Sequence, residues 1–197
     1  QVRIVDGALA HNIGEKRLGE IPGLGSRVEL GDMNIQVLDG CFTIREYHGT
    51  VKELCFDDEF VWAGPLVHDS VFRWLSHDVT PGYVLVSATD PSTVYMVTSI
   101  AAKGADDGLR LRYLRDGAFF GDLLQRHLRS KGFLSVGLGK GAFEIRDDGR
   151  PFWVVTRYVK RIGFAGEDAV GVVVVDAQTG AIEEFDIASA PAWIDRI

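Results

Sequence analysis

The sequence FEIRDDGRPFWVVTRYV at residues 143–159 is followed, after a short gap, by VGVVVVDAQTGAIEEFDI at residues 170–187. Each segment contains two runs of apolar and β-branched residues, separated by a polar turn at Asp147–Gly149 or Ala177–Gly180. Such runs are typical of β-hairpins, because glycine adopts the left-handed backbone that these turns require. Residues 142–187 are therefore predicted to form four antiparallel strands of one sheet. The apolar run Val172–Val175 is expected to be covered on both faces of that sheet.

Similar patterns occur earlier in the chain. Tyr83–Ala88 and Val94–Thr98 are predicted strands, joined by a turn at residues 89–92 whose proline presets the backbone angle φ. Residues 26–44 alternate apolar and polar side chains, which predicts strands with tight turns at Gly31-Asp32 and Asp39-Gly40. Residues 109–114 alternate as well and indicate a further strand.

The two cysteines fall in neighbouring predicted strands. If residues 41–44 and 51–56 form a hairpin centred near His48, Cys41 faces Cys55 to within one residue. Directly opposed residues of an antiparallel pair are close enough for a disulfide, which implies an oxidising compartment. The alternative is two buried free thiols that pack as small hydrophobes, as in a cytoplasmic protein. No CxxC or Cys/His spacing predicts a zinc site.

Three segments are predicted to be helical. They are residues 5–18, capped by Asp6 with an apolar stripe at Ala8, Leu9, Ile13 and Leu18; residues 65–77, with a stripe at Val67, Val71, Trp74 and Leu75; and residues 116–131, with a stripe at Phe120, Leu123, Leu124, His127 and Leu128. Gly132 lies where the last helix should end. Residues 21–26 are expected to be a loop, Asp57–Glu59 a solvated turn, and residues 101–108 a polar connector.

The sequence thus predicts an α+β fold, with antiparallel sheets of β-hairpins packed on about three helices. Residues 1–102 are expected to form an N-terminal α+β unit with a hairpin insertion. Residues 103–197 are expected to form a C-terminal helix with a four-stranded antiparallel unit, and the two units are also compatible with packing as one domain. The chain begins at Gln1 rather than Met and ends at PAWIDRI, which favours a processed chain or a piece of a longer protein.

The composition excludes several function classes. The chain has 197 residues, 46% hydrophobic content and a formal net charge of −7. An acidic chain without a basic run lacks the electrostatic footprint of a nucleic-acid-binding protein. No stretch of about 18 consecutive apolar residues exists, so no transmembrane segment is predicted.

No catalytic motif is complete. Gly132–Gly137 has the first spacing of a phosphate loop, but Leu138 occupies the position of the required lysine. His68, Asp69 and Ser70 are adjacent in sequence, which does not place their side chains together on a helix. Glu144, an acid within an apolar strand, is expected to face solvent, the alternative being a buried acid with a partner. His127, on an apolar stripe, is expected to be a satisfied core histidine. We predict no enzyme activity, no metal site and no cofactor.

The C-terminal segments resemble a known bacterial module. A helix followed by hairpins that close on VVVVDAQTGAIEEF is similar to the PepSY-type module of extracytoplasmic proteins. Residues 172–185 match its closing hairpin, residues 143–159 the preceding hairpin and residues 116–131 the helix. Residues 67–98 look like a second, degenerate copy, so two PepSY- or cystatin-like units are expected, with residues 26–61 outside the pattern. The resemblance implies an extracytoplasmic or membrane-associated protein that binds or inhibits other proteins.

Three functions remain compatible with the sequence. The first is a non-catalytic protein-interaction module of a larger membrane-associated chain or assembly, which binds a protein partner. The second is a structural subunit of a multi-chain complex, and the third is a small soluble enzyme with a site from His68, Asp69 and Glu144. Aromatic residues are candidates either for the core or for an exposed contact patch: Trp62, Phe72, Trp74, Phe119, Phe120, Phe152, Trp153 and Tyr158. Partner contacts are expected at Trp62, Trp153 and Trp193.

Overall fold

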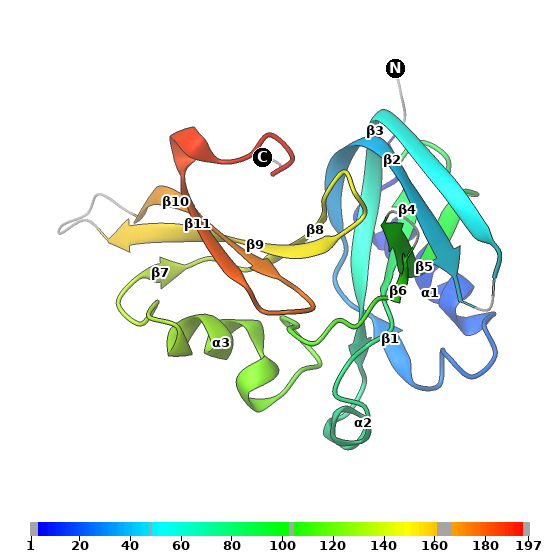
Figure 1. Ribbon diagram of the computed structural model, residues 1–197, viewed down its shortest axis with the longest axis horizontal. Helices are drawn as coiled ribbons and strands as arrows, with labels where there is room; N and C mark the ends of the chain where they lie inside the picture. The colour runs from blue at the N-terminus through cyan, green and yellow to red at the C-terminus, as the bar shows by residue number, and fades with distance from the viewer. Residues whose placement is uncertain (1–3, 48, 103–104, 161–166, 195–197) are drawn as a thin grey trace.

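Two antiparallel sheets lie beside each other in the computed structural model, which describes residues 4–47, 49–102, 105–160 and 167–194 (Figure 1). The N-terminal sheet contains β1 (Val28–Leu30), β2 (Asn34–Glu46), β3 (Val51–His68), β4 (Tyr83–Ser87), β5 (Val94–Ala102) and β6 (Ala105–Gly108). The C-terminal sheet contains β7 (Gly137–Leu138), β8 (Ala142–Ile145), β9 (Pro151–Lys160), β10 (Glu167–Asp176) and β11 (Ile182–Asp186). The helices of the described residues are α1 (Gly7–Gly19), α2 (Val71–Ser76) and α3 (Leu124–Ser130), with 3₁₀ turns η1 (Phe120–Asp122) and η2 (Ile187–Ser189). The predicted α+β class with antiparallel sheets and few helices is confirmed.

The N-terminal sheet closes on itself. Its strand order is β1-β3-β2-β5-β4, and β4 pairs in addition with β3, so that β3, β2, β5 and β4 form a ring. Strand β3 has 18 residues and changes partners along its length, pairing with β2, β4 and β1. The β4–β5 hairpin that the sequence predicts is present, with Val84 opposite Met96. Closure protects the long strands, since it leaves few unpaired edges.

Side chains of this sheet alternate between two apolar layers. Val84 and Val86 pack in the layer beneath α1, whereas Tyr83 and Leu85 point into the layer shared with the C-terminal sheet. Asp6 caps α1 as predicted, since its side chain accepts a hydrogen bond from the Leu9 amide at 2.9 Å. The predicted helical stripe is correct at Leu18 and in part at Ile13, which packs against the same cluster, but wrong at Ala8 and Leu9. The buried residues of α1 are Ala10, Gly14 and Leu18, and Ala8 and Leu9 are exposed.

The C-terminal sheet confirms the prediction from residues 142–187. Strands β11, β10 and β9 follow one another antiparallel, and β8 pairs with β9. Trp153, Val155, Val173 and Val175 face the common core, while Val154 and Val174 pack against Ile194. Both faces of β10 are thus covered, as the apolar run at residues 172–175 predicted.

The turn Asp176–Gly180 shows why the β10–β11 hairpin can be predicted from the sequence. The Asp176 carboxylate accepts hydrogen bonds from the amides of Gln178 at 2.8 Å and Thr179 at 2.9 Å. Gly180 has a φ of 72°, in the left-handed region, and a β-carbon there would lie 2.5 Å from the ring of Tyr113. Glycine is therefore required both by the turn and by the packing.

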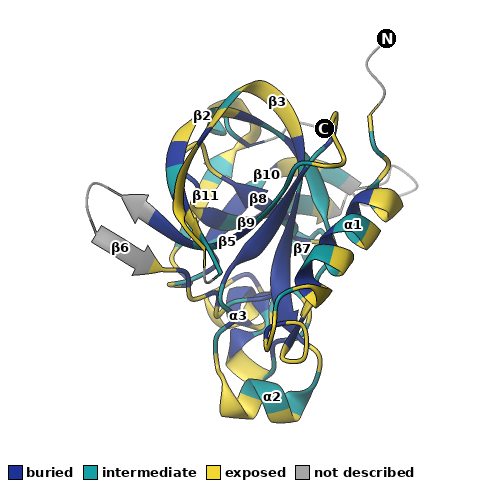
Figure 2. Cartoon of the chain, turned by 90° about the vertical axis from the view of Figure 1, so that its right-hand side faces the viewer, coloured by how far each residue is buried: buried dark blue, intermediate teal, exposed yellow. Residues whose placement is uncertain are grey.

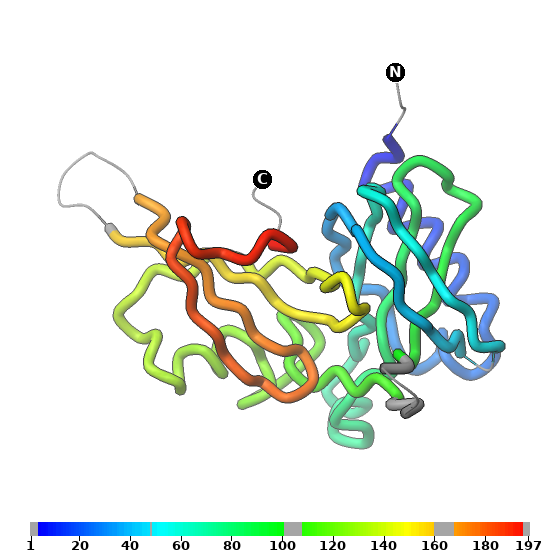
Figure 3. Tube along the Cα trace, turned by 45° about the horizontal axis from the view of Figure 1, so that its top comes forward, coloured from blue at the N-terminus to red at the C-terminus, as the bar shows by residue number. Residues whose placement is uncertain are grey.

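The two sheets share their largest apolar cluster. It combines residues such as Leu38 and Leu85 of the N-terminal sheet with Phe143 and Trp153 of the C-terminal sheet. The buried hydroxyl of Tyr83 donates a hydrogen bond to the carbonyl oxygen of Gly149, 2.8 Å away in the β8–β9 turn. Figure 3 shows the β8–β9 turn reaching the N-terminal strands. The expected boundary between residues 102 and 103 falls at the β5–β6 hairpin, beside residues 103 and 104, which lie outside the described part of the chain.

The turn expected at Asp39-Gly40 was wrong, because β2 continues through it. Leu38 pairs with Glu59 and Gly40 with Phe56, so Asp39 lies opposite two residues, Asp57 and Asp58, in a β-bulge. The acidic segment expected to be a solvated turn is therefore part of strand β3. Residues that favour a tight turn, such as Asp and Gly, also favour a β-bulge, because both structures need unusual backbone angles.

The helix predicted from Pro65 begins later. Strand β3 runs through Pro65 to His68, because the Pro65 carbonyl accepts from the Gly31 amide at 2.8 Å and the Leu66 amide donates to the Gly82 carbonyl at 3.0 Å. Proline is compatible with this strand, since its missing N–H is not needed by the ladder. The helix is the six-residue α2, which begins after Ser70.

The secondary structure expected for residues 101–131 also differs from the structure. Residues 105–108 form β6 rather than a connector. Residues 109–114 form isolated bridges, Thr80 to Leu111 and Leu114 to Leu123, rather than a strand. The long predicted helix is reduced to η1 and the seven-residue α3, of which Leu124, His127 and Leu128 are buried.

Candidate functional site

Large apolar side chains are exposed around helix α2, which projects at the bottom of Figure 1, away from both labelled chain ends. Phe72 is 77% exposed, Leu75 66% and Phe120 63%. Within the described residues these are three of the four most exposed large hydrophobic side chains, the fourth being Leu134. We call Phe72, Leu75 and Phe120 the apolar ledge. Exposed apolar clusters of this kind mark interaction surfaces more often than single exposed residues do.

Helix α2 is held by local contacts rather than by burial. The Ser70 hydroxyl accepts a hydrogen bond from the Arg73 amide at 3.4 Å, and the Arg73 guanidinium pairs with Asp69 at 2.8 Å. None of the residues of α2 is buried, as the exposed and intermediate colours of this helix in Figure 2 show. A six-residue helix is not stable alone, so its position depends on neighbouring elements.

Trp74 connects α2 to the neighbouring turn η1. Its ring lies 5.8 Å from the ring of Phe119 and 5.7 Å from that of Phe120, so η1 and α2 are joined through aromatic contacts. The indole Nε1 of Trp74 is buried and has no hydrogen-bond partner among the described residues. Trp74 thus joins Phe120 to the helix that carries Phe72 and Leu75.

Phe120 has an unusual backbone conformation. Its φ is 53°, in the left-handed region, and it is one of two non-glycine residues with positive φ in the described chain. This region costs an ordinary side chain about 1–2 kcal/mol. The strained backbone therefore holds an aromatic ring that is mostly exposed. Such strained residues cluster at functional surfaces.

The charges around the ledge are largely paired. Of the four aspartates in residues 69–78 and 116–122, Asp69 pairs with Arg73, Asp116 with Arg115 and Asp122 with Arg112. A helix that lies on a lipid surface usually has a basic polar face. The one arginine of α2 pairs with Asp69, so this helix has no free basic face, and the exposed apolar side chains complement an apolar segment of a partner.

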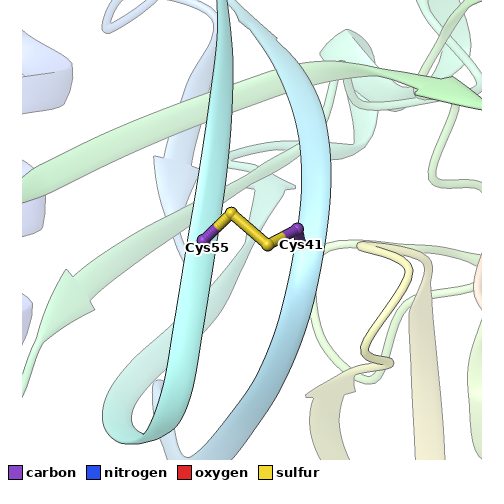
Figure 4. Close-up of a disulfide and its surroundings, with 2 residues drawn as sticks. All are labelled: Cys41 and Cys55. Carbon is purple, nitrogen blue, oxygen red and sulfur yellow. A yellow bond between two sulfur atoms is a disulfide. The ribbon is translucent and has the colours of Figure 1, made fainter.

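The predicted cysteine pair forms a disulfide between β2 and β3 (Figure 4). Cys41 and Cys55 are directly opposite in register, with their α-carbons 4.1 Å apart, and both residues are exposed. The hairpin prediction is confirmed for this pair, and Ile44 of the same hairpin faces Lys52. His48, the expected centre of the hairpin, lies outside the described residues.

The three tryptophans proposed as partner contacts lie in three different apolar clusters. Trp153 is 2% exposed in the common core, and its Nε1 donates to the Tyr113 carbonyl at 2.8 Å. Trp62 is half-buried near α1 and donates to the Val5 carbonyl at 2.9 Å. Trp193 packs against Phe152 with a ring separation of 5.4 Å. The structure does not bring the three side chains together on one surface.

The residues considered for catalysis have structural contacts instead. Ser70 caps α2 and Asp69 pairs with Arg73. Glu144 is 3% exposed, so the prediction that it faces solvent was wrong. Strand β8 is short and covered on both sides, and in such a strand the alternation of residues does not indicate which side chains are exposed. His127 is a satisfied core histidine, as predicted, since its Nε2–H donates to the Gly180 carbonyl at 2.8 Å. His68 is also buried and is considered below.

The ledge itself was only partly visible in the sequence. The sequence places Leu75 and Phe120 in the apolar stripes of predicted helices, and Phe72 and Phe120 are also candidates for either the core or a contact patch. One signal was available: Val71, Phe72, Trp74 and Leu75 surround a short helix on more than one side. A helix that is apolar all round must be buried or must bind something.

Among the described residues, no group of three or more histidines, cysteines or acids is placed to hold a metal ion. No helix in the described ranges is both long and apolar enough to span a bilayer. Comparisons of the chain with protein-family models, curated proteins and solved structures found no match.

Proposed function

We propose that this chain is a non-catalytic protein-interaction module of a larger extracytoplasmic, membrane-associated protein or assembly. The apolar ledge carries this proposal, because Phe72, Leu75 and Phe120 expose most of their apolar surface around one short helix. Its occupant is a partner protein that presents an apolar segment. The arginine of α2 is paired with Asp69 rather than free to bind lipid headgroups, which favours such a segment over an anionic lipid surface.

Two further observations support the proposed setting. The Cys41–Cys55 disulfide is exposed at the surface, and a disulfide of this kind persists in an oxidising compartment. In the C-terminal half, α3 and the Asp176–Gly180 turn pack together through His127. That contact supports our proposal of a PepSY- or cystatin-like unit there, in which a helix is joined to a closing hairpin.

Site-specific photo-crosslinking tests the ledge. A photoreactive phenylalanine analogue is placed at Phe72 in one protein and at Leu134 in another, and each is expressed in the native host. The two sites have similar exposure, 77% and 72%, but Leu134 lies outside the ledge. We expect a discrete protein adduct from position 72 that is absent from position 134. The adduct should be lost when Leu75→Ser is added.

The partner identified in this way is then purified and its affinity measured. Phe72→Ser and Phe120→Ser should each weaken binding at least about tenfold, as hot-spot residues do, whereas Leu134→Ser should not. Adducts with lipid alone, or the same adducts at both positions, would refute the proposal. An adduct between two copies of this chain would identify self-association instead.

A structural subunit of a multi-chain complex is the second candidate, since it would use the same exposed apolar surface. The two are separated by the stability of the isolated chain. An interaction module folds alone and binds reversibly, whereas an obligate subunit depends on partner concentration for its stability.

A further inference from the structure

A second candidate site lies at the C-terminal end of α2, in a cleft of about 340 Å³. The C-terminal end of α2, the end of β3 and the turn after α1 contribute to it. Its apolar walls are formed by Leu24, Val28, Val79 and Pro81. The volume is at the lower end of the range of small-molecule pockets. None of the ledge residues lines this cleft.

A buried histidine without a partner lines the cleft. His68 is 5% exposed, and neither Nδ1 nor Nε2 has a hydrogen-bond partner among the described residues. An imidazole has both a donor and an acceptor to satisfy, and buried polar groups are normally paired. His68 therefore differs from His127, whose Nε2–H donates to a carbonyl oxygen. An unpaired group beside a cleft indicates a partner that comes from outside the chain.

The rim of the cleft is basic, although the chain as a whole is acidic. Arg27 and Arg110 line it, both are exposed, and neither guanidinium forms an ion pair with a described residue. Asp78 is the one acidic side chain of the lining. Two unpaired guanidinium groups near an unpaired imidazole favour an anion, because arginine binds carboxylates through paired N–H groups.

We propose that this cleft binds a small organic carboxylate, with its anionic group held by Arg27, Arg110 and a ring N–H of His68 and its apolar body against the walls. The apolar lining distinguishes this ligand from a bare inorganic anion. His77 also lines the cleft, is exposed, and lies close enough to His68 to influence its pKa. Both ring nitrogens of His68 are buried, so the proposal requires a side chain of the lining to move when the ligand enters, and the exposed His77 is the candidate.

Binding of a carboxylate should raise the pKa of His68, which burial and the nearby His77 otherwise lower. The charged and titratable groups around the imidazole are Asp69, His77 and Asp78 along the chain, and Arg27, Tyr47 and Arg110 across the cleft. Binding should therefore tighten as the pH falls through the pKa of His68, because protonation adds a positive charge beside the carboxylate.

The test uses sodium octanoate as the probe and NMR signals of the His68 ring as the readout. We expect saturable changes at His68 and an upward shift of its pKa. Arg27→Gln and Arg110→Gln should each weaken octanoate binding about tenfold, the magnitude of one lost charge-assisted contact. Arg126→Gln, which removes an exposed guanidinium on α3 outside the cleft, should leave binding unchanged.

Two other probes define the ligand class. 1-Octanol has the same apolar body without the charge, and inorganic phosphate has the charge without the body. Equal binding of octanol would show a merely apolar cavity, and stronger binding of phosphate would show an anion site without an apolar requirement. Either result, or no saturable octanoate binding at millimolar concentration, would overturn the proposal. Because the tested arginines are exposed, these variants are expected to fold, and the ledge experiment is independent of them.

Discussion

The side-chain amide of Gln36 forms two hydrogen bonds with the backbone of Ile145. The amide nitrogen donates to the Ile145 carbonyl and the amide oxygen accepts from the Ile145 N–H, each at 2.8 Å. Gln36 lies in β2 and is 2% exposed, and Ile145 ends β8. The Gln36 side chain thus joins the two sheets through a pair of hydrogen bonds like those between neighbouring strands.

Gln36→Leu should therefore destabilise the whole protein. The leucine keeps an apolar volume but leaves the N–H and C=O of Ile145 buried without partners, at a cost of about 2–4 kcal/mol. Urea denaturation measures the change. Gln178→Leu is the control, because Gln178 accepts one hydrogen bond, from the exposed Arg110 amide, and its loss should cost about 0.5–1 kcal/mol. Equal losses for the two variants would show that Gln36 does not join the sheets.

The disulfide supplies a second prediction. The cysteines are 14 residues apart, and closing a loop of this length stabilises a fold by about 3 kcal/mol. Replacing Cys41 and Cys55 together by serine should lower the free energy of unfolding by up to that amount. Adding reductant to the wild-type protein should produce a similar loss. Alkylation without reductant, followed by mass measurement, should detect no free thiol; two alkylated cysteines would contradict the oxidised state.

His68 should make stability depend on pH. Burial and His77 lower its pKa in the folded protein, although Asp69 and Asp78 act in the opposite direction. The unfolded chain, with a histidine pKa near about 6.5, then binds more protons than the folded chain as the pH falls. The stabilisation is present above that pH and is lost progressively below it.

His68→Gln should therefore flatten the pH dependence of unfolding between about pH 8 and about pH 5.5. His11→Gln serves as the control, since the His11 ring is already hydrogen-bonded to the Leu30 carbonyl at 3.2 Å. If the wild-type and His68→Gln curves remain parallel over this range, the imidazole is not protected from protonation by the fold.

Local chemistry explains which elements were legible in the sequence. The turns at Asp147–Gly149 and Asp176–Gly180 satisfy their own backbone groups, so residues 142–187 predict their hairpins correctly. The Cys41–Cys55 pairing was predictable for the same reason, because a short hairpin determines its own register. The α1 cap at Asp6 also depends on a contact three residues away.

The remaining elements depend on contacts distant in sequence. Strand β3 passes through Pro65 because Gly31 and Gly82, far along the chain, supply its hydrogen-bond partners. The burial of Glu144 follows from the sheet that covers β8, and no pattern within residues 142–145 reveals it. The exposure of Phe72 and Phe120 is also non-local, since apolar periodicity indicates a face but not whether another element covers it.

The backbone of Phe120 supplies the last prediction. Both Phe120→Ala and Phe120→Gly remove the ring contact with Trp74, but only glycine relieves the positive φ of 53°. Phe120→Gly should therefore be more stable than Phe120→Ala by about 1 kcal/mol, the reverse of the usual order. Phe119 is the matched control, because it also contacts Trp74 but has a φ of −133°. There alanine should be the more stable substitution, as thermal or urea unfolding can measure. If Phe120→Gly is both as stable as the wild type and unable to form the ledge adduct, the strained conformation is maintained for binding rather than for folding. If alanine is the more stable substitution at both positions, the left-handed backbone at Phe120 carries no energetic cost. The proposed binding role of the ledge would then rest on the exposure of its side chains alone.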